Sequence, residues 1–277
     1  MIDGRTQLIA HIGYPTETFK SPMIYNPFFA KRAINAVVVP MGCKADDYAS
    51  FLRLLFKLTN IRGALITMPH KVTTLGLVDD ASVSARIAGA CNAVRIDQHG
   101  ALIGDMFDGE GFVRGVLKKG RHVAGAKVLV AGCGGVGSAI AASMAKAGVF
   151  RLGLYDAFAQ SMDGLSERLR THYPTLEVVT GSADPAGYDI VINATPLGMK
   201  KDDPLPMNVE RLSPSTFVGE VVMKQEITPF LAAARARGCD YQVGTDMLFE
   251  QIPAYLEFFG FGTATSDELR EIAQISY

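Results

Sequence analysis

The stretch Ala126-Lys127-Val128-Leu129-Val130-Ala131-Gly132-Cys133-Gly134-Gly135-Val136-Gly137-Ser138-Ala139 decides how the rest of the chain is interpreted. It opens with a short β-branched apolar run, which is typical of a buried parallel strand. Glycines at the spacing Gly-x-Gly-x-x-Gly follow directly, at Gly132, Gly134 and Gly137. An Ala-rich helix is expected over residues 138–147. The stretch therefore predicts a strand, a tight turn and a helix in immediate succession.

Each glycine of this turn has a separate physical task. Gly132 makes the tight turn, Gly134 lets backbone N–H groups approach a pyrophosphate, and Gly137 lets the helix and the strand pack closely. The N-terminus of the helix adds unpaired N–H donors and the positive end of a dipole. Glycine-rich turns are common, so a purely structural turn is the alternative. The strand before the loop and the helix after it favour dinucleotide binding.

An acidic residue follows the next predicted strand, which covers residues 150–155. This residue, Asp156, lies 19 positions after Gly137. A carboxylate at that distance from the glycine loop meets the ribose 2′-hydroxyl of a bound dinucleotide. The alternative role for Asp156 is to cap the helix that follows. We interpret it as a ribose-binding residue.

Composition excludes several classes of function. The chain has 277 residues, of which 48% are hydrophobic, so it can form one large domain or two modest ones. Its 27 basic and 28 acidic residues nearly cancel, and no basic block suggests a nucleic acid or a membrane surface as partner. No apolar segment could span a bilayer, and the first residues lack a signal-peptide layout, so we expect a cytoplasmic protein. The four cysteines are scattered, which favours free buried thiols and no metal site.

Alternating strand and helix patterns predict an α/β chain with two domains and a ligand cleft between them. The first domain covers residues 1–108 and contains a mostly parallel sheet. The second covers residues 109–249 and is built around the glycine loop, and helices at about 250–277 return to the first domain. Apolar runs predict strands at residues 6–12, 36–40, 63–69, 91–95, 101–103, 189–196, 216–222 and 240–243.

Several short motifs follow one another between about residue 11 and residue 260. They are residues 13–22, Thr67-Met68-Pro69-His70-Lys71, Gly89-Ala90-Cys91-Asn92, Asp108-Gly109-x-Gly111-Phe112, Gly132-x-Gly134-Gly135, Asn193-Ala194-Thr195-Pro196-Leu197-Gly198-Met199, Thr228-Pro229-Phe230-Leu231 and Gly244-x-x-Met247-Leu248-x-x-Gln251.

The identity and order of these motifs resemble the shikimate/quinate dehydrogenase family. The resemblance implies an N-terminal α/β substrate domain and a C-terminal Rossmann domain. It also implies hydride transfer between a nicotinamide and a ring carbon of shikimate, quinate or a related cyclic hydroxy acid, as in the shikimate pathway of aromatic amino acid biosynthesis. The family includes monomers and homodimers.

The resemblance assigns catalysis to Lys71 and Asp108. Oxidation of a secondary alcohol sends a hydride to the nicotinamide while a proton leaves the hydroxyl, so a base within hydrogen-bond reach is needed. A lysine in a partly desolvated cleft has its pKa lowered, and a nearby carboxylate raises it again. Asp108 can hold Lys71 in place and accept a hydrogen bond from a substrate hydroxyl. Which of the two residues moves the proton stays open. The non-catalytic alternative is that Lys71 is a surface lysine and that Asp108 caps a helix.

The same resemblance supplies the binding residues. Thr67, Asn92 and Gln251 match residues that hydrogen-bond the hydroxyls of the substrate, and each of these side chains both donates and accepts. Ser21 matches one hydroxyl of a carboxylate clamp. The residues implied to contact the cofactor are Gly132, Gly134, Gly135, Val136, Asp156, Thr195, Pro196, Gly244 and Met247.

Three departures from the family pattern lie around the expected substrate pocket. Phe19 stands where the family has the first serine of its carboxylate clamp, and Thr18 is the candidate replacement. Met106-Phe107 replaces Asn-Thr before the catalytic aspartate, and Glu220 and Met223 replace Asp and Tyr. A lost hydrogen bond to a charged group costs about 1.5–3 kcal/mol. We therefore expect weak activity on shikimate or quinate and a different ring acid as the true substrate.

The sequence after the second strand of the cofactor domain predicts the choice of cofactor. Relatives that use NADP carry Asn-Arg-Thr there, and the arginine holds the 2′-phosphate. This chain has Tyr155-Asp156-Ala157-Phe158. A carboxylate at Asp156 accepts from the 2′-hydroxyl and repels a phosphate, so we predict NAD.

Two other functions stay open at this stage. One is a related enzyme of aminoshikimate-type metabolism or of aromatic-acid catabolism, which the departures at Phe19, Met106 and Phe107 favour. The other is a non-catalytic regulator that binds NAD. The presence of both Lys71 and Asp108 disfavours a regulator, because a sensor needs the cofactor loop but no proton-transfer pair.

Overall fold

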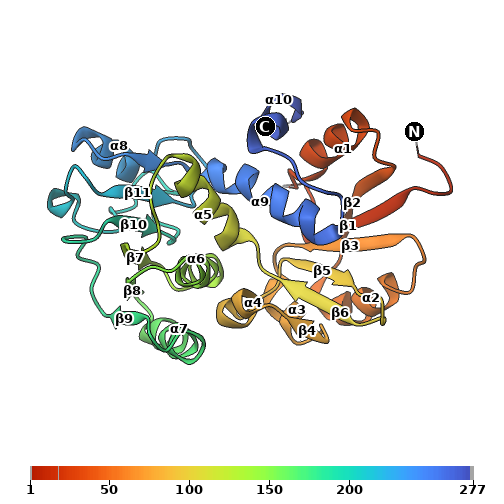
Figure 1. Cartoon of the computed structure of the whole chain (residues 1–277), viewed down its shortest axis with the longest axis horizontal. Helices are drawn as coiled ribbons and strands as arrows, with labels where there is room; N and C mark the ends of the chain where they lie inside the picture. The colour runs from red at the N-terminus through yellow and green to blue at the C-terminus, as the bar shows by residue number, and fades with distance from the viewer. Residues whose placement is uncertain (1, 18, 275–277) are drawn as a thin grey trace. The chain divides into compact units, whose positions relative to one another are not determined.

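The computed structural model describes residues 2–17 and 19–274, and it confirms an α/β chain with two sheets (Figure 1). The chain divides into two compact units. The first unit consists of Met1–Ala85, Gly89–Phe107 and Ile252–Tyr277, and the second of Arg86–Ala88 and Asp108–Gln251. Among the described residues, no helix is both long enough and apolar enough to cross a membrane.

The first unit contains a six-stranded sheet in the order β2-β1-β3-β5-β6-β4. β1 pairs in parallel with β2 and β3, whereas β5 runs antiparallel to both of its neighbours, β3 and β6, and a hairpin connects it to β6. The elements are β1 (Gln7–Gly13), α1 (Pro22–Lys31), β2 (Ala36–Gly42), α2 (Ala45–Leu55), β3 (Ile61–Ile66), α3 (Lys71–Leu75), β4 (Asp80–Ala81), α4 (Val83–Ala88), β5 (Ala93–Ile96) and β6 (Leu102–Asp105).

Alternating side chains of β1 separate the two faces of this sheet. Ala10 and Ile12 point into a cluster with Tyr48 and Leu52 of α2, so α2 covers that face. The C-terminal helices also belong to this unit. Arg32 at the end of α1 forms an ion pair with Glu268 of α10 (Ser266–Ile272) at 2.7 Å.

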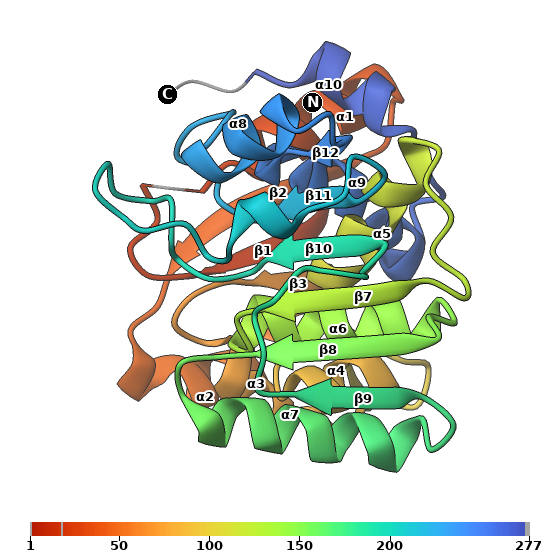
Figure 2. The ribbon, with the colours of Figure 1, turned by 90° about the vertical axis from the view of Figure 1, so that its left-hand side faces the viewer.

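The second unit contains a fully parallel sheet in the order β12-β11-β10-β7-β8-β9, and Figure 2 shows its strands side by side. The chain moves outward from β7 to β9 and then returns to start again at β10 on the other side of β7. A ligand crevice is typical of the carboxyl ends of strands at such a switch point. The elements are α5 (Asp108–Lys118), β7 (Lys127–Ala131), α6 (Gly135–Lys146), β8 (Arg151–Tyr155), α7 (Ala159–His172), β9 (Glu177–Thr180), β10 (Ile190–Asn193), the 3-10 helix η1 (Val209–Arg211), β11 (Phe217–Glu220), α8 (Pro229–Ala236), β12 (Tyr241–Gln242) and α9 (Gly244–Phe259). The division between the units falls within α9, whose residues from Ile252 onward belong to the first unit.

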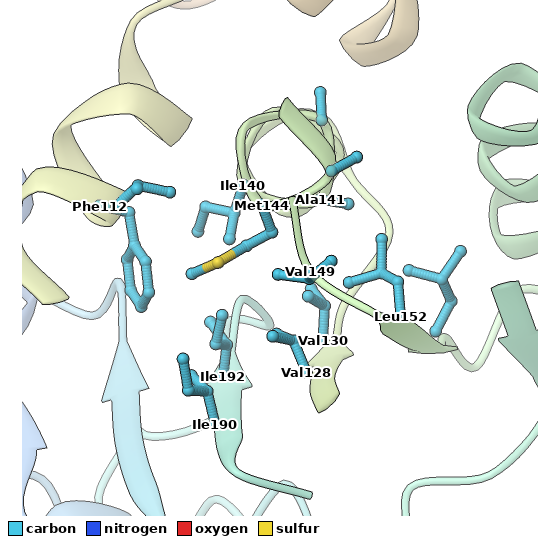
Figure 3. Packing of buried hydrophobic residues seen from close by; sticks show 14 of the residues in the cluster. Phe112, Val128, Val130, Ile140, Ala141, Met144, Val149, Leu152, Ile190 and Ile192 are labelled. Atoms are coloured by element: carbon cyan, nitrogen blue, oxygen red, sulfur yellow. The ribbon is translucent and has the colours of Figure 1, made fainter. Parts of the chain in front are cut away.

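The core of the second unit lies between this sheet and two helices. Phe112 of α5 and Met144 of α6 pack over the strand residues Val130 and Ile192, all buried (Figure 3). Strands that are buried on both faces read as continuous apolar runs, which is why β7 and β10 were readable from the sequence. α7 and β9 carry a more polar pattern and were not expected.

Candidate active site

The glycine loop has the geometry that a dinucleotide-binding turn requires. Gly132 has a φ of 100°, and a Cβ there would lie 2.6 Å from the carbonyl carbon of Ala194. A Cβ on Gly137 would overlap the carbonyl oxygen of Gly132. Gly134 and Gly135 are exposed, and a Cβ on either would meet nothing within 4 Å. The loop is therefore packed tightly on its inner side and open on its outer side, where α6 begins.

Asp156 lies beside this loop. One carboxylate oxygen accepts a hydrogen bond from the Cys133 N–H at 2.6 Å, and the other accepts from the Phe158 N–H at 2.8 Å. These bonds fix the carboxylate at the carboxyl end of β8, next to the turn. Phe158 itself is exposed, and an alanine separates it from Asp156.

The loop after β10 is held against the glycine loop. The Ala194 N–H donates to the Ala131 carbonyl at 2.7 Å, and the Thr195 hydroxyl donates to Asn193 Oδ1 at 2.6 Å. Pro196 follows and is exposed. Thr195 and Pro196 therefore lie at the same switch point as the glycine turn.

Glu220, at the end of β11, is fully buried next to this loop. Its Oε2 accepts from Asn193 Nδ2 at 3.5 Å. Burial raises the pKa of the Glu220 carboxyl to about 7, and hydrogen bonds from Thr228 and Asn193 oppose that rise. Met223, the other departure on this side, is exposed.

α5 brings Asp108 and Gln251 together within the second unit. Asp108 is the first residue of the helix and is buried. A Cβ on Gly111, one turn later, would lie 2.6 Å from Gln251 Cβ and 2.7 Å from the Met247 carbonyl oxygen. α5 therefore packs closely on α9 near its first turn. Gly244, which begins α9, lies against the backbone of Val222.

Backbone pairing in the first unit brings Thr67, Lys71 and Asn92 together. The Ile66 N–H donates to the Asn92 carbonyl at 2.8 Å, and Thr67 follows Ile66 at the end of β3. The Cys91 N–H donates to the Lys71 carbonyl at 2.9 Å. Asn92 is buried, and its Oδ1 accepts from the Phe107 N–H at 2.9 Å. The three predicted residues thus share the carboxyl end of β3.

The residue before Lys71 anchors α3. His70 is buried, stacks on the Tyr48 ring at 3.9 Å, and makes a 2.8 Å hydrogen bond through Nε2 to the Cys43 carbonyl oxygen. The Tyr48 hydroxyl bonds to Thr74 of α3 at 2.7 Å. This network fixes the helix that begins at Lys71, so His70 has a structural role.

Phe19 lies in the loop between β1 and α1 and packs against a residue of β1. Its ring stacks on His11, with ring centroids 4.0 Å apart and 26° between the planes. Ser21 is the residue before α1 and is half-buried, and its side chain makes no capping hydrogen bond. Thr18, the candidate replacement for the missing serine, lies outside the described residues.

The side chains of the second departure, Met106 and Phe107, are accommodated by packing. Met106 is buried, and Phe107 makes edge-on contacts with Tyr255 and Phe258 of α9 at 4.9 and 5.4 Å. The Phe107 ring therefore packs on the part of α9 that belongs to its own unit.

Sequence reasoning missed one residue of this region. His11 is 7% exposed, and its Nδ1 has no hydrogen-bond partner among the described residues. Burial, with a smaller contribution from the positive charge of Lys71, lowers the pKa of His11 to about 4. The available signal was a single histidine within the apolar run of β1, Leu8-Ile9-Ala10-His11-Ile12.

Comparison with known proteins identifies the family. Residues 11–94 match the model of the shikimate dehydrogenase substrate binding domain. The chain is 37% identical over 254 residues to shikimate dehydrogenase (NADP(+)) of Rubrobacter xylanophilus, covering 90% of this chain and 89% of that protein. The chain belongs to the shikimate dehydrogenase family. This confirms the resemblance carried by the motifs.

Solved structures of this family share the fold. The chain superposes on shikimate 5-dehydrogenase from Listeria monocytogenes in complex with shikimate and NAD, with a TM-score of 0.91, 26% identity and coverage of 98% and 97% of the two chains. It also superposes on the ligand-free 5-ketofructose reductase of Gluconobacter sp. strain CHM43, with a TM-score of 0.89, 27% identity and coverage of 98% and 99%. Proteins with this fold therefore carry names for different substrates.

Proposed function

We propose that this member of the shikimate dehydrogenase family is an NAD-dependent oxidoreductase. It transfers a hydride between the nicotinamide and a ring hydroxyl or ketone of shikimate, quinate or a related cyclic compound. The observation that carries the proposal is the open outer side of the glycine loop together with a carboxylate fixed beside it. The family membership adds the reaction class.

The residues of the second unit fit a dinucleotide. Gly132, Gly134, Gly135 and Val136 would hold the pyrophosphate, since no side chain fills the space above Gly134 and Gly135. The residues proposed to line the rest of the cofactor are Thr195, Pro196, Gly244 and Met247. When bound, the nicotinamide supplies a hydride acceptor.

We assign proton transfer to Lys71 and Asp108. Cleavage of the carbinol C–H bond sends the hydride to the cofactor, and the hydroxyl proton passes to one of these two side chains. Lys71 begins a helix that His70 and Tyr48 fix to the sheet, so its position is well defined. Asp108 is held at the first residue of α5.

Four polar side chains would bind the polar groups of the substrate. Thr67 and Asn92 lie at the carboxyl end of β3, Ser21 precedes α1, and Gln251 packs on α5. Each can donate and accept hydrogen bonds, which suits a polyhydroxy ring.

The preference for NAD follows from Asp156. Its carboxylate, fixed by two backbone N–H groups, would accept a hydrogen bond from the ribose 2′-hydroxyl and repel a 2′-phosphate. The relative from Rubrobacter xylanophilus is named for NADP, whereas the Listeria structure contains NAD. Asp156 is the residue that distinguishes these cases in this chain.

Initial rates with shikimate and quinate, measured with NAD⁺ and with NADP⁺, test the proposal. We expect turnover with NAD⁺ that is lost in Lys71→Ala. A lower KM for NADP⁺ than for NAD⁺ would overturn the choice of cofactor. NAD binding with no turnover of any cyclic alcohol would favour the non-catalytic regulator.

A further inference from the structure

The rings of Phe19 and His11 form a stacked pair at the carboxyl end of β1 in the first unit. Phe19 covers one face of the His11 imidazole. A Cβ on Gly13 would lie 3.0 Å from Phe19 Cζ and would overlap the methyl group of Thr67, so the Phe19 ring lies close to the residue that ends β3. Lys71, four residues later, is the charge that acts on His11. The stacked pair is therefore part of the same region as the proposed proton-transfer lysine.

The side chains of this stacked pair carry no charge near neutral pH. Phe19 offers no hydrogen-bond donor, and His11 is neutral because burial and the Lys71 charge lower its pKa to about 4. A carboxylate is recognised by charge-assisted hydrogen bonds or by a cation. A flat aromatic ring backed by a neutral imidazole provides neither, and it would desolvate an anion without compensation. Lys71, the cation of this region, is assigned to proton transfer at the reacting hydroxyl and not to binding an acid group.

We propose that Phe19 and His11 are specificity-determining residues, and that the substrate of this chain is a polyhydroxy alcohol or ketone that is uncharged where it meets them. The inference rests on the proposed function, since it concerns the substrate of the same hydride transfer. The inferred substrate is thus a neutral ring compound, in place of the ring acid expected from the sequence. Phe19 provides the apolar contact, and His11 holds the ring of Phe19 in position.

Shikimate and shikimate methyl ester form a matched pair of probes, since they differ in the charge of one group. For the unmodified protein with NAD⁺, we expect kcat/KM to be higher for the ester than for the acid. A kcat/KM about tenfold higher for the acid would overturn the proposal.

Two substitutions at Phe19 distinguish the effect of adding a hydroxyl from the effect of removing the aromatic ring. Phe19→Ser supplies a donor and should raise kcat/KM for shikimate about tenfold or more, mainly through KM. Phe19→Leu removes the ring but stays apolar, so it should leave the preference for the ester unchanged. Equal gains for shikimate in both variants would contradict the proposal, because the gain would then come from space alone.

His11→Leu and His11→Gln test the second residue. If the imidazole positions Phe19, His11→Leu should raise KM for the ester with little change in kcat, and His11→Gln should restore part of the loss. A change in kcat alone would refute a positioning role.

Calorimetric titration of both probes into each protein with NADH bound gives a readout that does not depend on turnover. Tighter binding of the ester by the unmodified protein, reversed in Phe19→Ser, supports the inference even if the rates are low. Tighter binding of shikimate by the unmodified protein refutes it. Loss of turnover with all probes, combined with tighter ester binding, would refute the proposed function and leave the binding preference standing.

Discussion

The two units differ in how their proposed sites are built. In the second unit the proposed cofactor site consists mainly of backbone groups, a glycine turn and the N-terminus of α6, together with one side-chain carboxylate bonded to two N–H groups. In the first unit the proposed substrate site consists of side chains near the carboxyl ends of β1 and β3, where Phe19 stands at the position expected to hold a serine. A backbone site tolerates few changes, whereas side chains on a fixed sheet can change the substrate without changing the fold.

Two buried titratable groups, His11 in the first unit and Glu220 in the second, respond to pH in opposite directions. The pKa of His11 falls to about 4 and that of Glu220 rises to about 7, and burial is the main cause in both cases. Both groups therefore favour their neutral forms. Acidification opposes the fold through His11, whereas a rise in pH opposes it through Glu220.

Removal of Lys71 is expected to affect catalysis in the first unit without affecting NAD binding in the second. Lys71→Ala should lower kcat by about 10²–10⁴-fold, the usual contribution of a positioned acid or base, and leave NAD binding unchanged. Steady-state rates and NADH fluorescence titration measure the two quantities. Lys57→Ala, at an exposed lysine of the same unit, is the control and should be neutral. Retention of most turnover in Lys71→Ala would remove this residue from catalysis.

Glu220→Gln tests the buried carboxyl of the second unit. A folded pKa above the unfolded value means that stability is lost as pH rises from about 4.5 to about 7. The glutamine of the variant does not ionise, so this pH-dependent loss is absent. The free energy of unfolding of the variant relative to that of the unmodified protein should therefore rise by up to about 3 kcal/mol between pH 5 and pH 8. Urea unfolding at both pH values measures this. Exposed Glu226→Gln should show no such trend, and an equal trend in both variants would refute the assignment.

Gly137→Ala and Gly134→Ala compare the inner and outer sides of the glycine loop. A Cβ at Gly137 overlaps the Gly132 carbonyl oxygen, so we expect a loss of about 1–3 kcal/mol in the free energy of unfolding. A Cβ at Gly134 meets open space, so stability should hold while NAD binding weakens. Denaturant unfolding and NADH titration distinguish the two. If Gly134→Ala binds NADH normally, the pyrophosphate does not approach that side.

The smallest expected effect concerns the cofactor. Asp156→Asn combined with Ala157→Arg should raise the ratio of kcat/KM for NADP⁺ to that for NAD⁺ by about tenfold or more, because the first substitution removes a carboxylate that repels the 2′-phosphate and the second adds a cation that binds it. Activity on the alcohol substrate should otherwise be kept. An unchanged ratio would show that Asp156 does not contact the ribose.

Several features were predictable because they depend on local sequence. The strands at β7 and β10 are continuous apolar runs, and the turn between β7 and α6 needs glycine at Gly132 and Gly137 for steric reasons. The polar helix α7 and the short strand β9 were missed because their sequence patterns are weak, and β9 forms through its parallel pairing with β8.

The sequence alone determined the fold class, the glycine loop and the family, because backbone sterics and hydrophobic periodicity act over short stretches of chain. Tertiary structure decided what the departures mean. Phe107 packs on Tyr255 and Phe258 of α9, and Phe19 stacks on His11. The physical reason is that side-chain packing and the shift of a buried group's pKa depend on neighbours that only the folded chain brings together.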